Sequence, residues 1–279
     1  MSFAGRIAMI HNYIFKTACL ALLTVAFLSC STVPLTGRRQ LNLIPSSEML
    51  SMSSDQYGQF LKSNKKSTDP KGVQMVQTVG HRIQNAVERY VAQNNMSDRL
   101  SGYNWEFNLV ESREVNAWCM PGGKVVVYTG ILPVARDEQG LAVVLGHEIA
   151  HAIAEHGNER MSQQLLAQYG GAALSELVKD KPQETQQLWM SAFGVGVQYG
   201  ALLPFSRTQE SEADHLGLIF MSMAGYDPRG AVEFWQRMTS QAGGGAPPEI
   251  LSDHPADATR IAQIQQELPE ALKYYTPKK

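Results

Sequence analysis

The sequence has no stretch rich in lysine and arginine, no internal repeat and no low-complexity tract. Its 279 residues carry a formal net charge of −2 and 18% charged residues. Because a protein that binds a phosphate backbone needs a basic patch, we exclude nucleic acid as a partner. With 44% hydrophobic residues, the chain can bury a sizeable core, which excludes a disordered or collagen-like protein.

Cysteine is scarce, with three in the chain: Cys19, Cys30 and Cys119. A leader cut before Cys30 would remove Cys19, and a lipid on Cys30 would leave Cys119 as the single thiol. A disulfide within the mature chain is then excluded. Packing must therefore stabilise the fold, and a bound metal is a second source to consider.

The chain also lacks a long uninterrupted apolar run near its start. Residues 17–28 are uncharged and apolar and follow the basic Arg6 and Lys16, but a membrane span needs about 20 such residues. This layout is typical of a secretory signal, and Cys30 directly after it resembles a lipidated cysteine of bacterial lipoproteins. The alternative is an uncleaved N-terminal anchor helix.

These features predict three parts of the chain. Residues 1–29 are expected to be a lipoprotein-type signal peptide, and residues 30–47, which contain prolines, a glycine and serines, a tether. Residues 48–279 are expected to form one domain.

Within the domain, the hydrophobic pattern predicts helices with a few strands. Apolar residues recur at helical spacing through much of the chain, whereas residues 103–109 alternate apolar and polar side chains as a half-buried strand does. We expect an α+β fold, mostly α-helical, with a small antiparallel β-sheet. The expected helices lie within residues 46–91 (two helices), 137–155, 205–225 and from 255, and the strands at 103–109, 115–120 and 125–128.

Residues 189–203 carry no charge but contain three glycines. At about 15 residues the segment is short for a membrane span, so a buried helix or a mobile lid is the preferred interpretation. An integral-membrane protein is the alternative.

The motif with the clearest chemistry is His147-Glu148-Ile149-Ala150-His151. Histidines four positions apart on a helix differ by about 40° around its axis and can bind one zinc ion together. Glu148 can then act as general base on a water at that metal. The alternative is a surface helix with two histidines that play no catalytic role.

A third ligand is needed, and His156 is a poor candidate. It lies about 180° around the helix from His147 and could reach the metal only if the helix ended and the chain folded back. We therefore expect His156 to be a structural partner near Arg160. The better donors are Glu210 and Asp214, which share a helix face: one can bind zinc and the other can accept the free N–H of a ligating histidine. A solvated acidic face is the alternative.

The chain resembles a known family in several motifs that occur in the same order. HEIAH (147–151) followed by ESEAD (210–214) is similar to the gluzincin metallopeptidases of the HtpX, CAAX prenyl protease and Oma type, and in particular to their small bacterial periplasmic lipoproteins. The other matching segments are CSTVPLTGRRQLNLI (30–44), VNAWCMPGGKVVVYTGIL (115–132), AGYDPRGAVEFWQRM (224–238) and DHPADATR (253–260).

The resemblance implies His147, His151 and Glu210 as ligands of one zinc ion, with Glu148 as base. It implies Asp214 as the residue that supports a ligand from behind. Two further features gain a meaning from it. Asn116 and Ala117 would begin an edge strand to which a peptide substrate adds, and His254 would approach the metal. There His254 could stabilise the oxyanion, or it could occupy the open position of zinc and silence the enzyme; a capped helix start is the alternative without function.

The expected function is a zinc metalloendopeptidase of the bacterial cell envelope, located in the periplasm as a lipoprotein of the outer membrane. Its substrates would be misfolded or misassembled envelope proteins. The alternative from another class is a non-proteolytic chaperone or assembly factor with a structural zinc site. The sequence does not decide the oligomeric state.

Overall fold

The computed structural model describes residues 30–34, 36–179, 183, 187, 206–242, 250–251, 254 and 258–277. It confirms the α+β class, with helices in the majority. The expected leader at 1–29 and the segment 189–203 lie outside the described residues. The helices are α2 (Ser46–Ser63), α3 (Pro70–Gln93), α4 (Leu132–Ala135), α5 (Glu138–Ile153), α6 (His156–Val178), α8 (Arg207–Met223), α9 (Gly230–Ala242) and α11 (Ala258–Lys273), with short 3-10 turns at η1 (Ser97–Leu100) and η2 (Thr129–Ile131).

The main sheet contains β3 (Glu106–Val110), β4 (Ala117–Met120) and β5 (Lys124–Tyr128) in the order β3-β5-β4. β5 pairs antiparallel with β4 but parallel with β3, so the sheet is mixed and the purely antiparallel arrangement expected from the sequence is wrong. The reason is that the fully buried run of valines in β5 takes the central position. The chain leaves β3, forms β4, and returns in the direction of β3. β4 is left at an edge of this sheet.

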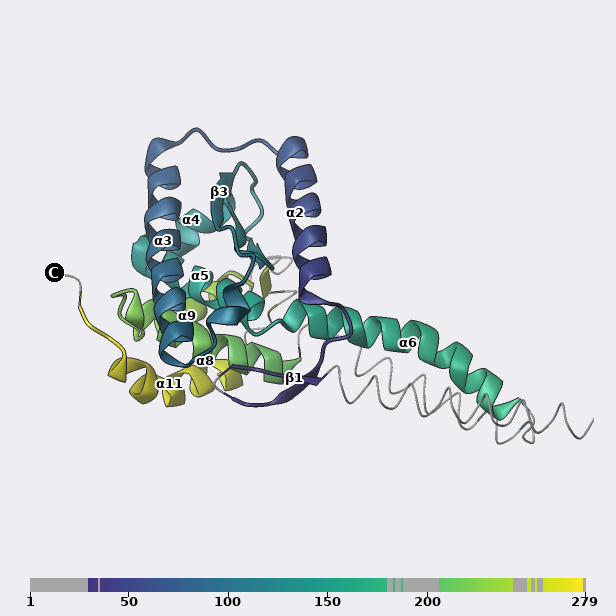
Figure 1. Ribbon diagram of the computed structural model, residues 1–279. Helices are drawn as coiled ribbons and strands as arrows, with labels where there is room; N and C mark the ends of the chain where they lie inside the picture. The colour runs from purple at the N-terminus through teal and green to yellow at the C-terminus, as the bar shows by residue number, and fades with distance from the viewer. Residues whose placement is uncertain are drawn as a thin grey trace, which may run out of the picture.

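Helix α5 lies at the centre of the domain, between the sheet and helices α3, α8 and α9 (Figure 1). The side chain of Asp137 caps the start of this helix by accepting a hydrogen bond from the backbone N–H of Gly140 at 2.9 Å. Every residue from Gly140 to Ile153 is buried. The polar residues of the HEIAH motif therefore lie inside a core, where they need partners.

Two glycines allow α5 and α8 to cross at very short range. A Cβ on Gly217 would lie 2.9 Å from both the carbonyl carbon of Gly146 and the backbone nitrogen of His147. A Cβ on Gly146 would lie 2.8 Å from the carbonyl oxygen of Gly217. Because neither residue has a side chain, the two backbones touch, and this contact sets the distance between the motif on α5 and the acidic residues on α8.

The N-terminal strap, which we define as residues 30–44, begins with β1 (Cys30–Thr32) paired antiparallel with β2 (Arg39–Leu41). A tether was the expectation for this region, but the strap packs on the domain where α5 ends and α6 begins. The side-chain amide of Gln40 donates to the carbonyl of Ala154 at 2.8 Å, and Gln40 is 2% exposed. The prolines, glycine and serines of this region predict an irregular backbone, but they do not predict that the strap packs on the domain.

No helix in the described part of the chain is long and apolar enough to cross a membrane. Helix α6 extends well away from the other described elements (Figure 1).

Gly217→Ala should destabilise the protein, because the added methyl group meets backbone that cannot move aside. We expect a loss of about 1 to 3 kcal/mol in the free energy of unfolding, measured by urea denaturation. Gly58→Ala is the matched control, since a Cβ there has nothing within 4 Å, and it should be neutral or stabilising by about 0.5 to 1 kcal/mol. Equal effects of the two substitutions would contradict the proposed tight crossing.

Candidate metal centre

His147 and His151 face the same way from α5, as their spacing predicts. Both are buried, and their Nε2 atoms lie 3.1 Å apart. Two imidazole nitrogens this close repel each other unless a proton or a cation lies between them. The Nδ1 of His147 faces a carboxylate oxygen of Asp214 at 2.9 Å, so Nδ1 carries the proton and Nε2 is available as a donor to a metal.

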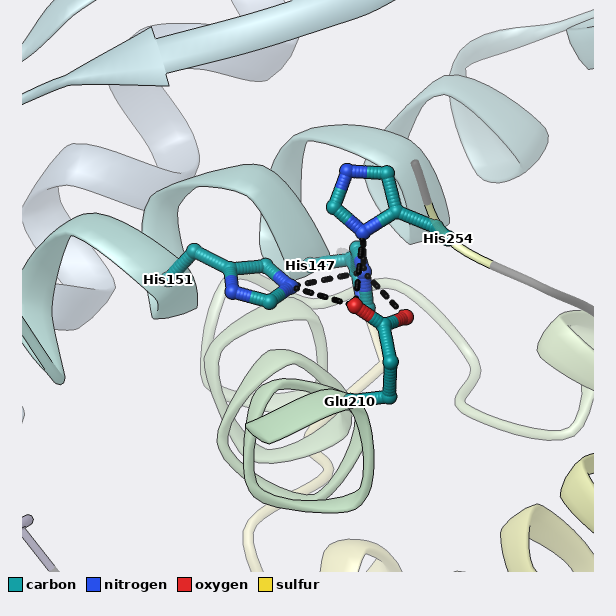
Figure 2. Close-up of side chains that lie close together, drawn as sticks. All are labelled: His147, His151, Glu210 and His254. Carbon is teal, nitrogen blue, oxygen red and sulfur yellow. Dashed lines mark hydrogen bonds and ion pairs between the residues drawn. The ribbon is translucent and has the colours of Figure 1, made fainter. Parts of the chain in front are cut away.

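Glu210 comes to this pair from the first turn of α8. That helix starts with a capping box, in which Ser206 and Gln209 satisfy each other's backbone N–H. Oε2 of Glu210 lies 3.4 Å from Nε2 of His147, and Oε1 lies 3.3 Å from Nε2 of His151. Figure 2 shows the carboxylate pointing at both rings.

His254 completes the cluster from a segment that follows α9. Its Nδ1 lies 3.2 Å from Nε2 of His147 and 2.8 Å from Oε1 of Glu210 (Figure 2). The ligand atoms of His147, His151, Glu210 and His254 all lie within 4.8 Å of one another, and all four residues are buried. The donors predicted from HEIAH and ESEAD are thus brought together, with a third histidine, His254, beside them.

The dimensions of this cluster fit a zinc ion. Ligand atoms that lie 2.0 to 2.1 Å from a tetrahedral centre are about 3.3 Å from one another, and the measured separations scatter around this value. Nitrogen donors from histidine with one carboxylate oxygen are the donors that zinc takes in catalytic sites. The expectation of one zinc ion per chain agrees with this donor set.

Asp214 is not one of the four clustered donors; its Oδ1 lies 2.9 Å from Nδ1 of His147. Its carboxylate accepts two hydrogen bonds from Arg260, at 2.8 Å from Nε and 2.8 Å from Nη2. The guanidinium also lies 3.0 Å from Glu210 and stacks over Trp235, with its Cζ 3.7 Å from the ring centroid. The sequence motif around His254 contains Arg260, yet no role was predicted for it, because its partners are distant in sequence.

Burial and charge act in opposite directions on the ionisable groups here. Burial alone would lower the pKa of His147, but the negative charges of Glu210 and Asp214 raise it to about 9. Burial raises the pKa of the Glu148 carboxyl, although His254 and His147 oppose that shift. Within the described part of the chain, Oε1 of Glu148 has no hydrogen-bond partner; it lies 3.7 Å from Nε2 of His254. A buried carboxylate oxygen without a donor is free to accept a proton from a small ligand.

The remaining predicted residues are placed as follows. Ala117 begins the edge strand β4, and Asn116 directly precedes it. Cys30 is the first residue of β1, and its lipidation stays a prediction. His156 does not approach the metal position; it contacts His151 and Glu212 instead.

The model for Peptidase family M48 matches residues 78–268. The chain belongs to this family. The M48 match confirms the resemblance drawn from the sequence motifs. Mitochondrial metalloendopeptidase OMA1 of Schizosaccharomyces pombe is 37% identical over 190 residues, which are 68% of this chain and 53% of that protein.

Other M48-type relatives are more distant. Metalloendopeptidase OMA1, mitochondrial, of Bos taurus is 31% identical over 251 residues, covering 86% of this chain and 46% of that protein. Beta-barrel assembly-enhancing protease of Yersinia pestis is 31% identical over 201 residues, which cover 71% of this chain and 39% of that protein. The chain thus spans about half the length of the curated relatives it matches, or less.

These relatives correct the expected location. A periplasmic lipoprotein of the bacterial outer membrane was the expectation from residues 1–30, but relatives that are 31% to 37% identical are mitochondrial proteins. The expectation is wrong because a basic start followed by a short apolar stretch is not specific to one compartment, whereas the domain itself resembles proteins of mitochondria.

Zinc binding should release about one proton per ion at pH 7. His147 is protonated in the metal-free protein, because its pKa is about 9, and it must lose that proton to bind. Calorimetric titration with zinc in buffers of different ionisation enthalpy measures the number released, which should fall as the pH rises through 9. The exposed His81 is the control: His81→Ala should change neither the number of protons released at pH 7 nor its dependence on pH. Zinc binding without proton release at pH 7 would show that His147 is not protonated in the metal-free protein.

Proposed function

We propose that this protein is a zinc-dependent endopeptidase that cleaves extended segments of misfolded or misassembled proteins. The observation that carries the proposal is the position of Glu148: a buried carboxylate oxygen that accepts no hydrogen bond from the described residues, one residue from His147 and beside the four clustered donors. A site that only stabilised the fold would not need such a group. Membership in peptidase family M48 and the endopeptidase names of the relatives support it.

The chemistry follows from the arrangement of the side chains. His147, His151 and Glu210 would hold the zinc ion, which when bound polarises the scissile carbonyl and lowers the pKa of the attacking water. Glu148 would accept a proton from that water as its oxygen bonds to the carbonyl carbon. As the C–N bond breaks, Glu148 would return the proton to the leaving amine. The buried surroundings strengthen each of these electrostatic interactions.

The edge strand β4 supports the proposed substrate class. Among the described strands, β5 alone pairs with β4, so the other side of β4 can accept an extended peptide by main-chain hydrogen bonds. A folded protein rarely exposes such a segment, whereas a misfolded or unassembled one does. Asn116 and Ala117 would begin this contact. The name of one set of relatives, Beta-barrel assembly-enhancing protease, agrees with a role around protein assembly.

His254 would act as a latch. Its Nδ1 occupies the fourth corner of the donor set, which a catalytic zinc site leaves open for water or substrate. Of the two roles expected from the sequence, occupation of the open position fits these distances, whereas an oxyanion contact would leave Nδ1 farther from Glu210. Substrate binding along β4 would have to displace His254 before the reaction.

A structural zinc site also has a closed set of four donors. This observation favours one alternative function. In that case the protein would be a non-proteolytic chaperone or assembly factor, and Glu148 would have no role. The two functions differ in the result of one substitution, because a structural site does not need a general base.

Glu148→Gln should abolish cleavage of unfolded casein while the bound zinc, measured by atomic absorption, stays at one per chain. Loss of a general base lowers kcat by about 10² to 10⁴. Glu88→Gln, the same change at an exposed position on α3, should leave activity unchanged. If Glu148→Gln restored the function of a null mutant in full, the chaperone would be the better assignment.

His254→Ala should raise the cleavage rate in the absence of other activation. If the latched state is favoured by about 1.4 kcal/mol, removing it gives an increase of about tenfold. The initial rate on a short quenched-fluorescence peptide at saturating zinc measures this change. A fall in rate with zinc still bound would instead assign His254 to oxyanion stabilisation.

A further inference from the structure

The chain folds back sharply just after the second histidine of the motif. Helix α5 ends at Ile153, and Glu155 adopts a left-handed conformation with φ of 60° before α6 begins at His156. A residue with a side chain adopts this conformation only where its surroundings enforce it. The reversal places Nδ1 of His156 2.9 Å from Nδ1 of His151, and His156 is 0% exposed.

The hydrogen bond between the two histidines has one consistent direction. If Nε2 of His151 binds zinc, its Nδ1 carries the proton and donates to His156. His156 must then accept at Nδ1 and carry its own proton at Nε2. That Nε2 lies 3.2 Å from Oε2 of Glu212, a carboxylate oxygen that can only accept. Glu212 therefore selects the form of His156 that His151 needs.

Glu212 is held in turn by Arg38 of the N-terminal strap. Nε of Arg38 donates to Oε1 at 2.9 Å, and Nη2 donates to Oε2 at 2.9 Å. The hydroxyl of Thr36 adds a third hydrogen bond at 2.8 Å. The Glu212 side chain is 5% exposed, so this charge is stable at its position only while the strap supplies the opposite charge.

Glu159 gives a useful comparison. It accepts hydrogen bonds from Nη1 and Nη2 of the same Arg38, at 2.7 and 2.8 Å, and is buried to the same degree as Glu212. It also accepts a hydrogen bond from the side-chain amide of Gln209, at 2.6 Å. Glu159 thus anchors the strap through Arg38, whereas Glu212 binds Arg38 and also contacts His156.

We propose that Arg38, Glu212 and His156 are positioning residues for the metal ligand His151. This deepens the proposed function, since it rests on zinc bound at His151. His147 is supported by a carboxylate on α8, Asp214, which is itself bound by Arg260. The proposed support of His151 is of the same kind, with Glu212 bound by Arg38, except that His156 lies between the carboxylate and the ligand. The strap is therefore part of the metal site, although it supplies no ligand.

The test compares Glu212→Gln with Glu159→Gln in the full chain, using the zinc dissociation constant from competition with a chelator. Loss of a residue that orients a metal-bound histidine weakens affinity by about 10- to 100-fold, which is the result expected for Glu212→Gln. Glu159→Gln removes an equally buried charge next to Arg38 and should change affinity by less than about threefold. Equal losses would show that the strap acts only as an anchor and would overturn the proposal.

The visible spectrum of the cobalt-substituted protein gives a second readout that general destabilisation would not move. The bands that report ligand geometry should change in Glu212→Gln and in Arg38→Ala, but not in Glu159→Gln. His156→Asn keeps an acceptor near the position of Nδ1 and should retain more zinc affinity than His156→Phe. If the spectra of Glu212→Gln and Arg38→Ala match that of the unaltered protein, the proposal fails.

These measurements do not depend on peptidase activity. If the Glu148→Gln variant rescued a null mutant in full, the proposed peptidase function would be refuted. The zinc affinity would still report on the support of His151. Conversely, an unchanged zinc affinity in Glu212→Gln would refute the positioning role and leave the enzyme in place.

Discussion

The contact between Gly146 and Gly217 is the constraint on which the rest of the site depends. It brings the backbones of α5 and α8 together, and only at that separation do Glu210 and the two histidines of α5 reach tetrahedral spacing. The crossing is stable because the apolar residues around it are buried on every side. The metal centre is therefore built into the core itself and does not lie on loops at its surface, which keeps its donors rigid and largely desolvated.

A single short segment of α8 supplies three different acidic roles. Glu210 faces the metal position, Asp214 stands behind His147, and Glu212 stands behind His151 through His156. Each supporting carboxylate is paired with an arginine that comes from far away in the chain. Three buried negative charges within five residues would repel one another strongly, so the two arginines are needed for the helix to be stable as well as for the histidines to be oriented.

The sequence was sufficient where the relevant residues lie on one helix. The i, i+4 spacing of His147 and His151 and the shared face of Glu210 and Asp214 are both local, and the structure places these residues together. Expectations that depended on packing were less successful: the direction of β3 and the docking of the strap. On an uninterrupted helix His156 would face away from His151; the left-handed residue Glu155 turns it toward Nδ1 of His151, and the sequence carries no signal for that turn. Arg38 and Arg260 were missed as site residues because their contacts are set by tertiary structure alone.

The hydrogen bonds between Arg38 and Glu212 join residues 174 positions apart, and Arg260 lies still closer to the C-terminus than Glu212 does. During synthesis, which proceeds from the N-terminus, His151 gains its full support only after Glu212 has left the ribosome, and His147 only after Arg260 has. A partly made chain would thus have the HEIAH helix but only a weak hold on a metal ion. The separation of these residues in sequence therefore delays the full metal site until most of the chain has been made.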